Sequence, residues 1–184
     1  GVMYGMGYKK LAVDLDISPK EAKAMLTQFR EKVPFMQGML EAVMHRANKV
    51  GSIRTYLGRR CKFDLWEPNW FEMDPVTKQP VFHKALPHNE AVVKWGGSIK
   101  RAGTYKALNR LIQGTAADQT KKAMVDIYEK LGIIPLIQVH DELNCSVKSD
   151  IMARDIKDIM ENCIKLEVPT KVTYKIKTNW GDAK

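Results

Sequence analysis

The chain has 184 residues, of which 45% are hydrophobic, and a formal net charge of +9 from 30 Lys and Arg against 21 Asp and Glu. This is enough for one domain, or for two small lobes, with a core of its own. A basic excess of this size favours a polyanionic partner, most simply nucleic acid, although charge alone also fits a solvated basic surface.

Cysteine spacing and apolar runs exclude several classes of protein. Cys61, Cys145 and Cys163 form neither a CxxC pair nor a zinc-binding spacing, which favours a reduced, intracellular compartment. No apolar run approaches about 18 residues, and the N-terminus has no apolar signal region, so neither membrane spanning nor secretion is indicated.

The first 65 residues are predicted to be mainly helical. Residues 8–16 form a short helix, and Ser18-Pro19 with Glu21 has the pattern of a capping box that starts the next. Pro34 ends that helix and begins another, which stops before Gly51. Two short strands, 52–57 and 59–65, follow around a glycine.

Residues 66–98 have the least regular pattern in the chain. They contain Trp66, Trp70 and Trp95 among several prolines and glycines. This composition predicts an irregular insertion, with a hairpin around residues 75–81.

The last part of the chain, residues 99–184, alternates helical and strand patterns. A long helix is expected over 99–131 and a second over 150–166, with Asp150 as its cap. Strands 134–139 and 142–147 are joined by His140-Asp141, a two-residue hairpin connection. Apolar and basic side chains alternate over residues 171–177, as in a half-buried strand with one basic, solvent-exposed face.

The tip of the predicted hairpin places His140, Asp141 and Glu142 together at an exposed turn. Mg²⁺ takes carboxylate oxygens and usually needs only one or two from the protein, the rest coming from substrate phosphates and water. The turn is therefore a candidate for one metal of a two-metal phosphoryl-transfer site. Spacing alone fits an ordinary polar turn equally, since Asp is frequent in turns.

Three further groups are candidates for nucleic-acid contact. Asn109 and Gln113 are four residues apart, so they share a helix face, where amides reach base edges or sugars. The aromatic ring of Tyr4 beside Gly5 suits base stacking. The predicted strand pair carries basic residues suited to phosphates, namely Arg54, Arg59, Arg60 and Lys62. Taken singly, each also fits a structural role: a helix contact, a core tyrosine or a solvated face.

The order of these segments along the chain is more specific than any one of them. They resemble, together, the C-terminal part of family A DNA polymerases, the class of bacterial polymerase I and related phage replicases. The segments that carry the resemblance are Gly1–Gly5 with Met6, Thr55–Arg60, Asn109–Asp118, Gln138–Leu143 and Asn179-Trp180.

The resemblance implies a role for each matched position. Tyr4 and Gly5 would end the fingers helix that closes over the nucleotide, with Tyr4 beside the templating base. Asn109 and Gln113 would contact primer–template near the nascent pair. His140 would contact the primer terminus, and Asp141 would bind metal, with Glu142 as an adjacent, less essential carboxylate. Arg59 and Arg60 would lie near phosphates.

The resemblance also implies the fold, the reaction and the partners. The fold class would be α+β, with a small antiparallel palm sheet packed by helices and a helical fingers lobe. Residues 1–65 would be the fingers part, 66–98 an insertion and 99–184 the palm. The activity would be template-directed addition of deoxynucleotides to a primer 3′ end with Mg²⁺, in the cytoplasm of a bacterial or phage-infected cell. The other metal aspartate is expected on a separate N-terminal chain.

Two alternatives belong to other functional classes. A polymerase-derived palm could bind DNA without chemistry, as a binding module. A metal-dependent nuclease using Asp141, Glu142 and Asp118 is the third hypothesis, and degradation of a labelled primer in place of its extension would support it.

Overall fold

The computed structural model describes Val2 and residues 6–183, and the chain divides into two compact units. The first unit runs from Gly1 to Ile112 and the second from Gln113 to Lys184. Both contain helices together with short antiparallel strands, which confirms the predicted α+β fold class. Within the described part of the chain, no helix is both long enough and apolar enough to cross a membrane.

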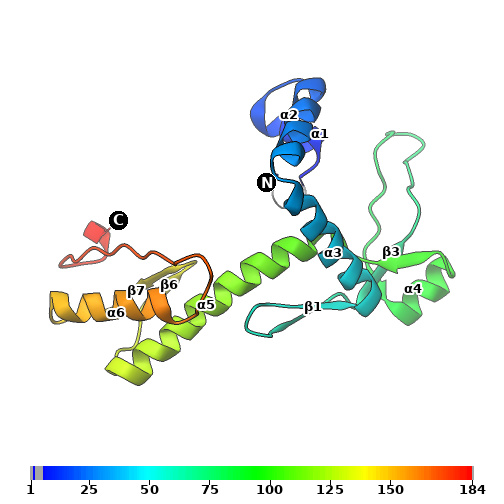
Figure 1. Ribbon diagram of the computed structural model, residues 1–184. Coiled ribbons are helices and arrows are strands. Elements are labelled where there is room, and N and C mark those ends of the chain that lie inside the picture. Colours follow the sequence, from blue (N-terminus) through cyan, green and yellow to red (C-terminus); the bar gives the residue numbers. More distant parts are fainter. Residues whose placement is uncertain (1, 3–5, 184) are drawn as a thin grey trace. The chain divides into compact units, whose positions relative to one another are not determined.

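The first unit begins with three helices and continues with strands around a fourth (Figure 1). Its elements are α1 (Tyr8–Leu15), α2 (Pro19–Lys32), α3 (Pro34–Val50), β1 (Ser52–Arg54), β2 (Arg60–Lys62), β3 (Leu65–Pro68), β4 (Leu86–Pro87), α4 (His88–Trp95), β5 (Ile99–Arg101), the 3₁₀ turn η2 (Thr104–Lys106) and the start of α5 (Ala107–Leu131).

The start of α2 confirms the predicted capping box. The Ser18 hydroxyl accepts a hydrogen bond from the Glu21 amide at 3.2 Å, and the Glu21 carboxylate accepts one from the Ser18 amide at 3.0 Å. Pro19 occupies the first helical position, where its missing N–H costs nothing. α2 then packs against α1 through a small buried cluster of Leu11, Ala12, Ala22 and Leu26.

A second core cluster lies where α3 meets the first strand pair. α3 ends at Gly51, whose φ of 71° is the left-handed conformation that glycine adopts without strain. β1 and β2 pair antiparallel on either side of Gly58, as predicted but as shorter strands. Their inner face contributes to a cluster of Ala47, Ile53, Phe63 and Ala107.

Residues 66–98 are more regular than the sequence predicted. β3 pairs with β4 on one side and with β5 on the other, and α4 packs against this three-stranded sheet. The hairpin expected around 75–81 is present as an antiparallel bridge between Met73 and Pro80. The elements that the prediction missed depend on pairing between residues far apart in sequence, which local composition does not reveal.

The prediction of a helix from residue 99 was wrong for residues 99–103, and residues 104–106 form the 3₁₀ turn η2 before the α-helix. Residues 99–101 form β5, which pairs with β3 from Trp66 to Pro68. Gly103 has a φ of 69°, and α5 begins only at Ala107. β-Pairing with a distant strand therefore overrides the helical pattern here, and a left-handed glycine separates the two structures.

The second unit contains the rest of α5, the strand pair β6 (Ile137–Val139) and β7 (Glu142–Asn144), helix α6 (Asp150–Asn162) and the 3₁₀ turn η3 (Gly181–Ala183) (Figure 1). The predicted hairpin is confirmed, with Val139 opposite Glu142. The cap of α6 is Ser149 and not Asp150, because the Ser149 hydroxyl accepts from the Met152 amide at 3.3 Å.

Residues 171–177 do not form the predicted strand, so the hairpin pairs with no third strand among the described residues. Side chains of α6 hold this segment in place. The Val172 amide donates to the Glu161 carboxylate at 2.8 Å, and the Tyr174 hydroxyl donates to Asp150 at 3.0 Å. The alternating pattern is present, but a strand also requires backbone pairing, and no described strand pairs with this segment.

Candidate functional site

The turn between β6 and β7 brings the three predicted catalytic residues together. The register pairs Val139 with Glu142, so His140 and Asp141 are the two residues of the connection. His140 has a φ of 53°, a conformation that His tolerates better than most residues other than glycine. The side-chain amide of Gln138 donates to the His140 backbone carbonyl and so supports the turn.

The side chains of the turn are exposed and make few hydrogen bonds or ion pairs with other described residues. The Glu142 carboxylate accepts a hydrogen bond from the side-chain amide of Asn144 at 3.2 Å. No hydrogen bond or ion pair to Asp141 occurs within the described residues. The oxygens of Asp141 are therefore available to a ligand, and carboxylate oxygens are what a hard cation such as Mg²⁺ takes.

The turn does not form a complete metal cage. Across residues 2 and 6–183, no group of three or more His, Cys, Asp and Glu side chains is arranged to hold a metal ion. Among the described residues, this turn could therefore offer a metal ion one or two carboxylates at most.

An open groove of about 580 Å³ begins at this turn. It is lined by Asp141 and β7, by the extended segment 171–175, and by residues of α6 that include Ala153, Ile156 and Met160. β7 pairs only with β6 among the described strands, so its other edge carries backbone groups without a strand partner. The groove therefore has carboxylates and apolar side chains in its lining, next to a strand that has one unpaired edge.

Three lysines that were not predicted as site residues also line this groove, namely Lys157, Lys171 and Lys175. The alternation of residues 171–177 had indicated a basic face, but not its position beside Asp141. Cationic side chains next to the carboxylates make the groove suitable for an anionic ligand that also binds metal.

The two amides predicted to contact nucleic acid are exposed on α5. Asn109 lies in the first unit and Gln113 in the second. Arg110 ties the start of the helix to the strand pair, since its guanidinium donates to the Lys62 carbonyl at 3.4 Å and lies 4.9 Å over the Phe63 ring. Asp118, the third carboxylate of the nuclease hypothesis, is 7% exposed and has a polar partner of its own.

The strand pair β1–β2 has one buried face and one basic face. Ile53 and Cys61 stand opposite each other on the inner face, and Arg54 and Arg60 stand opposite each other on the outer face. Like charges that face each other across a strand pair repel. A bound anion between the two arginines would reduce this repulsion, so the face is suited to binding an anion. Arg59, at the end of the connecting turn, is exposed, and its amide donates to Thr55 at 3.0 Å.

Two predicted contacts cannot be placed on the structure. Tyr4 and Gly5 lie outside the described residues. The remaining positions fall into two sets: Arg59, Arg60 and Asn109 in the first unit, and Gln113 with the His140–Glu142 turn in the second.

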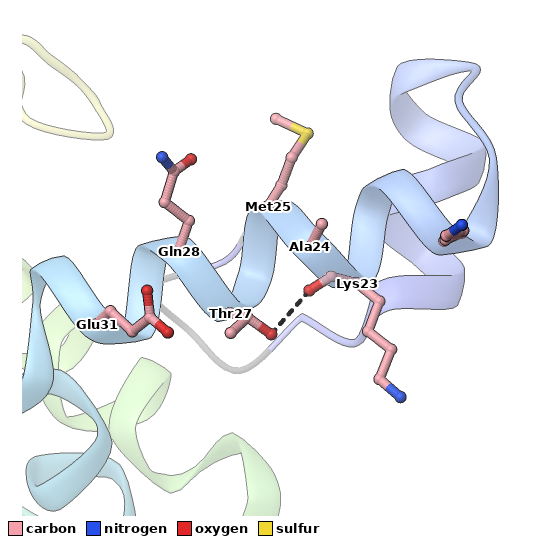
Figure 2. A pocket seen from close by; sticks show the side chains of 7 residues that line it. Lys23, Ala24, Met25, Thr27, Gln28 and Glu31 are labelled. Atoms are coloured by element: carbon pink, nitrogen blue, oxygen red, sulfur yellow. Dashed lines mark hydrogen bonds between the residues drawn. The ribbon is translucent and has the colours of Figure 1, made fainter.

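A further hollow lies on the exposed surface of α2, where Lys23, Thr27 and Glu31 are among the side chains that surround it (Figure 2). All the lining residues come from this one helix, and the Thr27 hydroxyl donates back to the Lys23 carbonyl at 3.1 Å. It is a shallow helix surface with mixed charge and no convergent catalytic groups.

Comparison with known proteins agrees with the sequence resemblance. A profile of DNA polymerase family A matches residues 1–182. A DNA-directed DNA polymerase of Pseudomonas phage M6 is 38% identical over 161 residues, which is 88% of this chain and 20% of that protein. The thermostable DNA polymerase I of Thermus aquaticus is 31% identical over 190 residues, covering 100% of this chain and 20% of that protein.

A solved structure gives the same result. The POL domain of Pol1 from M. smegmatis, in complex with DNA primer-template and dNTP, matches with a TM-score of 0.65 and 28% identity. The match covers 92% of this chain and 27% of that one. The chain spans about a fifth of the length of the curated relatives described above.

Proposed function

Because the chain belongs to DNA polymerase family A, we propose that it is the C-terminal part of a template-directed DNA polymerase, which adds deoxynucleotides to a primer 3′ end. The observation that carries the proposal is the exposed His140-Asp141 turn at the mouth of a groove with an open strand edge. A polymerase in complex with primer-template and dNTP has a similar fold, which supports DNA and deoxynucleoside triphosphates as ligands.

The residues of the turn fit Mg²⁺ as a cofactor. Asp141 offers carboxylate oxygens that no described side chain occupies, and Glu142 lies beside it. When bound in a two-metal site, Mg²⁺ would activate the primer 3′ oxygen and stabilise the leaving pyrophosphate.

The chain's own residues would bind and orient the substrates. His140, next to Asp141, would contact the primer terminus, and the exposed amides of Asn109 and Gln113 would contact primer–template near the nascent pair. Arg59 and Arg60 would lie near phosphates, consistent with the basic face of β1–β2. The role proposed for Tyr4 and Gly5, beside the templating base, rests on the family resemblance alone.

We further propose that a separate N-terminal polymerase chain carries the other metal aspartate. Two features support this. The described residues hold no metal cluster of three ligands, and the groove beside β7 is bounded by a strand edge and an extended segment. A strand from that second chain would satisfy the backbone of β7 and bring its carboxylate close to Asp141. The relatives' bacterial and phage origins favour action in the cytoplasm of a bacterial or phage-infected cell.

Primer extension tests this proposal. The 184-residue chain, alone and then with a co-expressed N-terminal polymerase segment, is given a labelled primer–template, Mg²⁺ and deoxynucleotides. We expect extension only when both chains are present. Extension by the chain alone would contradict the need for a partner. DNA binding without extension in either setting would favour the non-catalytic binding module, and degradation of the primer would favour a nuclease.

A further inference from the structure

Residues 69–85 form a hairpin arm that the proposed function does not use. We call this segment the arm; it leaves the sheet after β3 and returns to it at β4 (Figure 1). The match to the polymerase family profile spans the arm, but none of the metal- or substrate-binding residues proposed above lies in it.

Hydrogen bonds support the arm at its tip and in its middle. At its tip, the Asp74 carboxylate accepts from the amides of Val76 and Thr77 at 2.9 and 2.6 Å. In its middle, the Val81 amide donates to the Glu72 carbonyl at 2.9 Å. A platform with fixed geometry loses less conformational entropy on binding than a mobile loop does.

The base of the arm is fixed by His83. Its Nε2 lies 2.8 Å from the Glu72 carboxylate, and its ring makes an edge contact with Trp95 of α4 at a centroid distance of 5.8 Å. Both strands of the arm are therefore connected to each other and to the helix that packs on the sheet.

Two phenylalanines stand opposite each other on this ribbon and face solvent. The pairing of Met73 with Pro80 puts Phe71 and Phe82 at facing positions, and they are 74% and 90% exposed. Trp70, at 44% exposed, is adjacent. The ring faces of Phe71 and Phe82 are flat and apolar and are exposed to solvent, so unpaired bases can stack on them.

The charges of the arm favour an anionic ligand in a modest way. Both of its carboxylates are engaged within the arm, Glu72 by His83 and Asp74 by the turn amides, which hold the pKa of Asp74 below its ordinary value. Its two lysines, Lys78 and Lys84, are exposed and have no ion pair among the described residues.

The formal charge of the arm is nonetheless balanced, with Glu72 and Asp74 against Lys78 and Lys84. Binding to duplex DNA depends mainly on many basic contacts with phosphates, which the arm lacks. Binding to single strands depends more on aromatic stacking, which requires unpaired bases with exposed faces.

We propose that the arm binds the single-stranded template, with unpaired bases stacked on Phe71 and Phe82 and with Lys78 and Lys84 near the phosphates. The identification of the template as the source of that strand rests on the proposed function. The stacking itself does not, so the two are tested separately.

The test measures how much a single-stranded overhang adds to DNA affinity. Fluorescence anisotropy compares the 184-residue chain on a blunt labelled duplex and on the same duplex with an oligo-dT 5′ overhang of about 12 nucleotides, within the usual range of site sizes. We expect the overhang to raise affinity at least about fivefold, as for one or two stacked bases. In Phe71→Ala/Phe82→Ala the gain should vanish while affinity for the blunt duplex is unchanged.

Two further variants are controls. Val93→Ala removes an apolar side chain that is 89% exposed on α4, outside the arm, and should leave the overhang gain intact. Phe82→Trp preserves a stacking ring and should keep the gain, with the added indole quenched when the overhang binds. Far-UV circular dichroism checks that each variant is folded. We expect that all are, because the substituted side chains are exposed.

The inference would be overturned if the overhang did not raise the DNA affinity of the wild type, or if it still raised the affinity of the double alanine variant. An equal loss on the blunt duplex would also overturn it. Loss of a co-purifying protein with unchanged DNA binding would identify the arm as a protein-docking element, which also overturns it. If the gain depends on the two rings but the completed polymerase extends no primer, the arm binds single strands and the proposed function alone fails.

Discussion

A Cβ atom at Gly51 would lie 2.7 Å from the guanidinium carbon of Arg101, which fills the space beside the end of α3. That guanidinium donates to the Asn48 carbonyl at 3.1 Å and to the Phe63 carbonyl at 2.9 Å, and it lies 4.7 Å over the Trp66 ring. Arg101 thus joins α3, β3 and the segment after β2 through one side chain.

Gly51→Ala is therefore expected to destabilise the first unit. The left-handed backbone alone costs about 1–2 kcal/mol for alanine, and the new methyl group must also displace Arg101 from its two carbonyls. Urea denaturation followed by circular dichroism measures the change. Gly38→Ala is the matched control: this glycine is inside α3 with open space around it, so alanine should stabilise by about 0.5–1 kcal/mol. Equal effects of the two changes would contradict the account.

The capping box of α2 predicts a pH dependence. The hydrogen bonds from the Ser18 side chain and backbone hold the pKa of Glu21 below its ordinary value of 4.5. A carboxyl with a lowered pKa in the folded state stabilises the fold above its unfolded pKa, and this contribution is lost as pH falls through the folded value. Glu21→Gln should therefore flatten the loss of thermal stability below about pH 4.5. A pH profile of thermal stability that is the same in Glu21→Gln as in the wild type would contradict this account.

Several local features could be predicted from the sequence because they depend on neighbouring residues. Ser18 and Glu21 specify a helix start, Gly51 a helix end, and His140-Asp141 a two-residue turn, each through contacts within a few residues.

The errors arose where distant backbone decides the structure. Residues 99–101 have a helical pattern but pair with β3. Residues 171–177 have a strand pattern but pair with no strand in the described part of the chain. Of the candidate site, the turn was predictable, whereas the groove was not. Its lysines come from α6 and from the C-terminal segment, and only tertiary structure brings Lys157 and Lys171 beside Asp141.

The basic face of β1–β2 is expected to contribute to DNA affinity without sequence preference. Arg60→Gln should weaken binding to duplexes of different sequence by a similar factor, and should reduce the slope of log affinity against log salt by about one. Lys9→Gln, an exposed charge change on α1, should alter the slope less. An affinity loss confined to one sequence would show that Arg60 reads bases and not phosphates.

The most direct test of the central claim is primer extension by the completed polymerase with Asp141→Ala, compared with Asp155→Ala on the exposed surface of α6. If Asp141 binds catalytic metal, its removal should lower the extension rate at least about a hundredfold while primer–template affinity stays within a few fold. Asp155→Ala should extend primers like the wild type. Extension by Asp141→Ala at a rate close to that of Asp155→Ala would contradict the assignment of this turn as the metal-binding element.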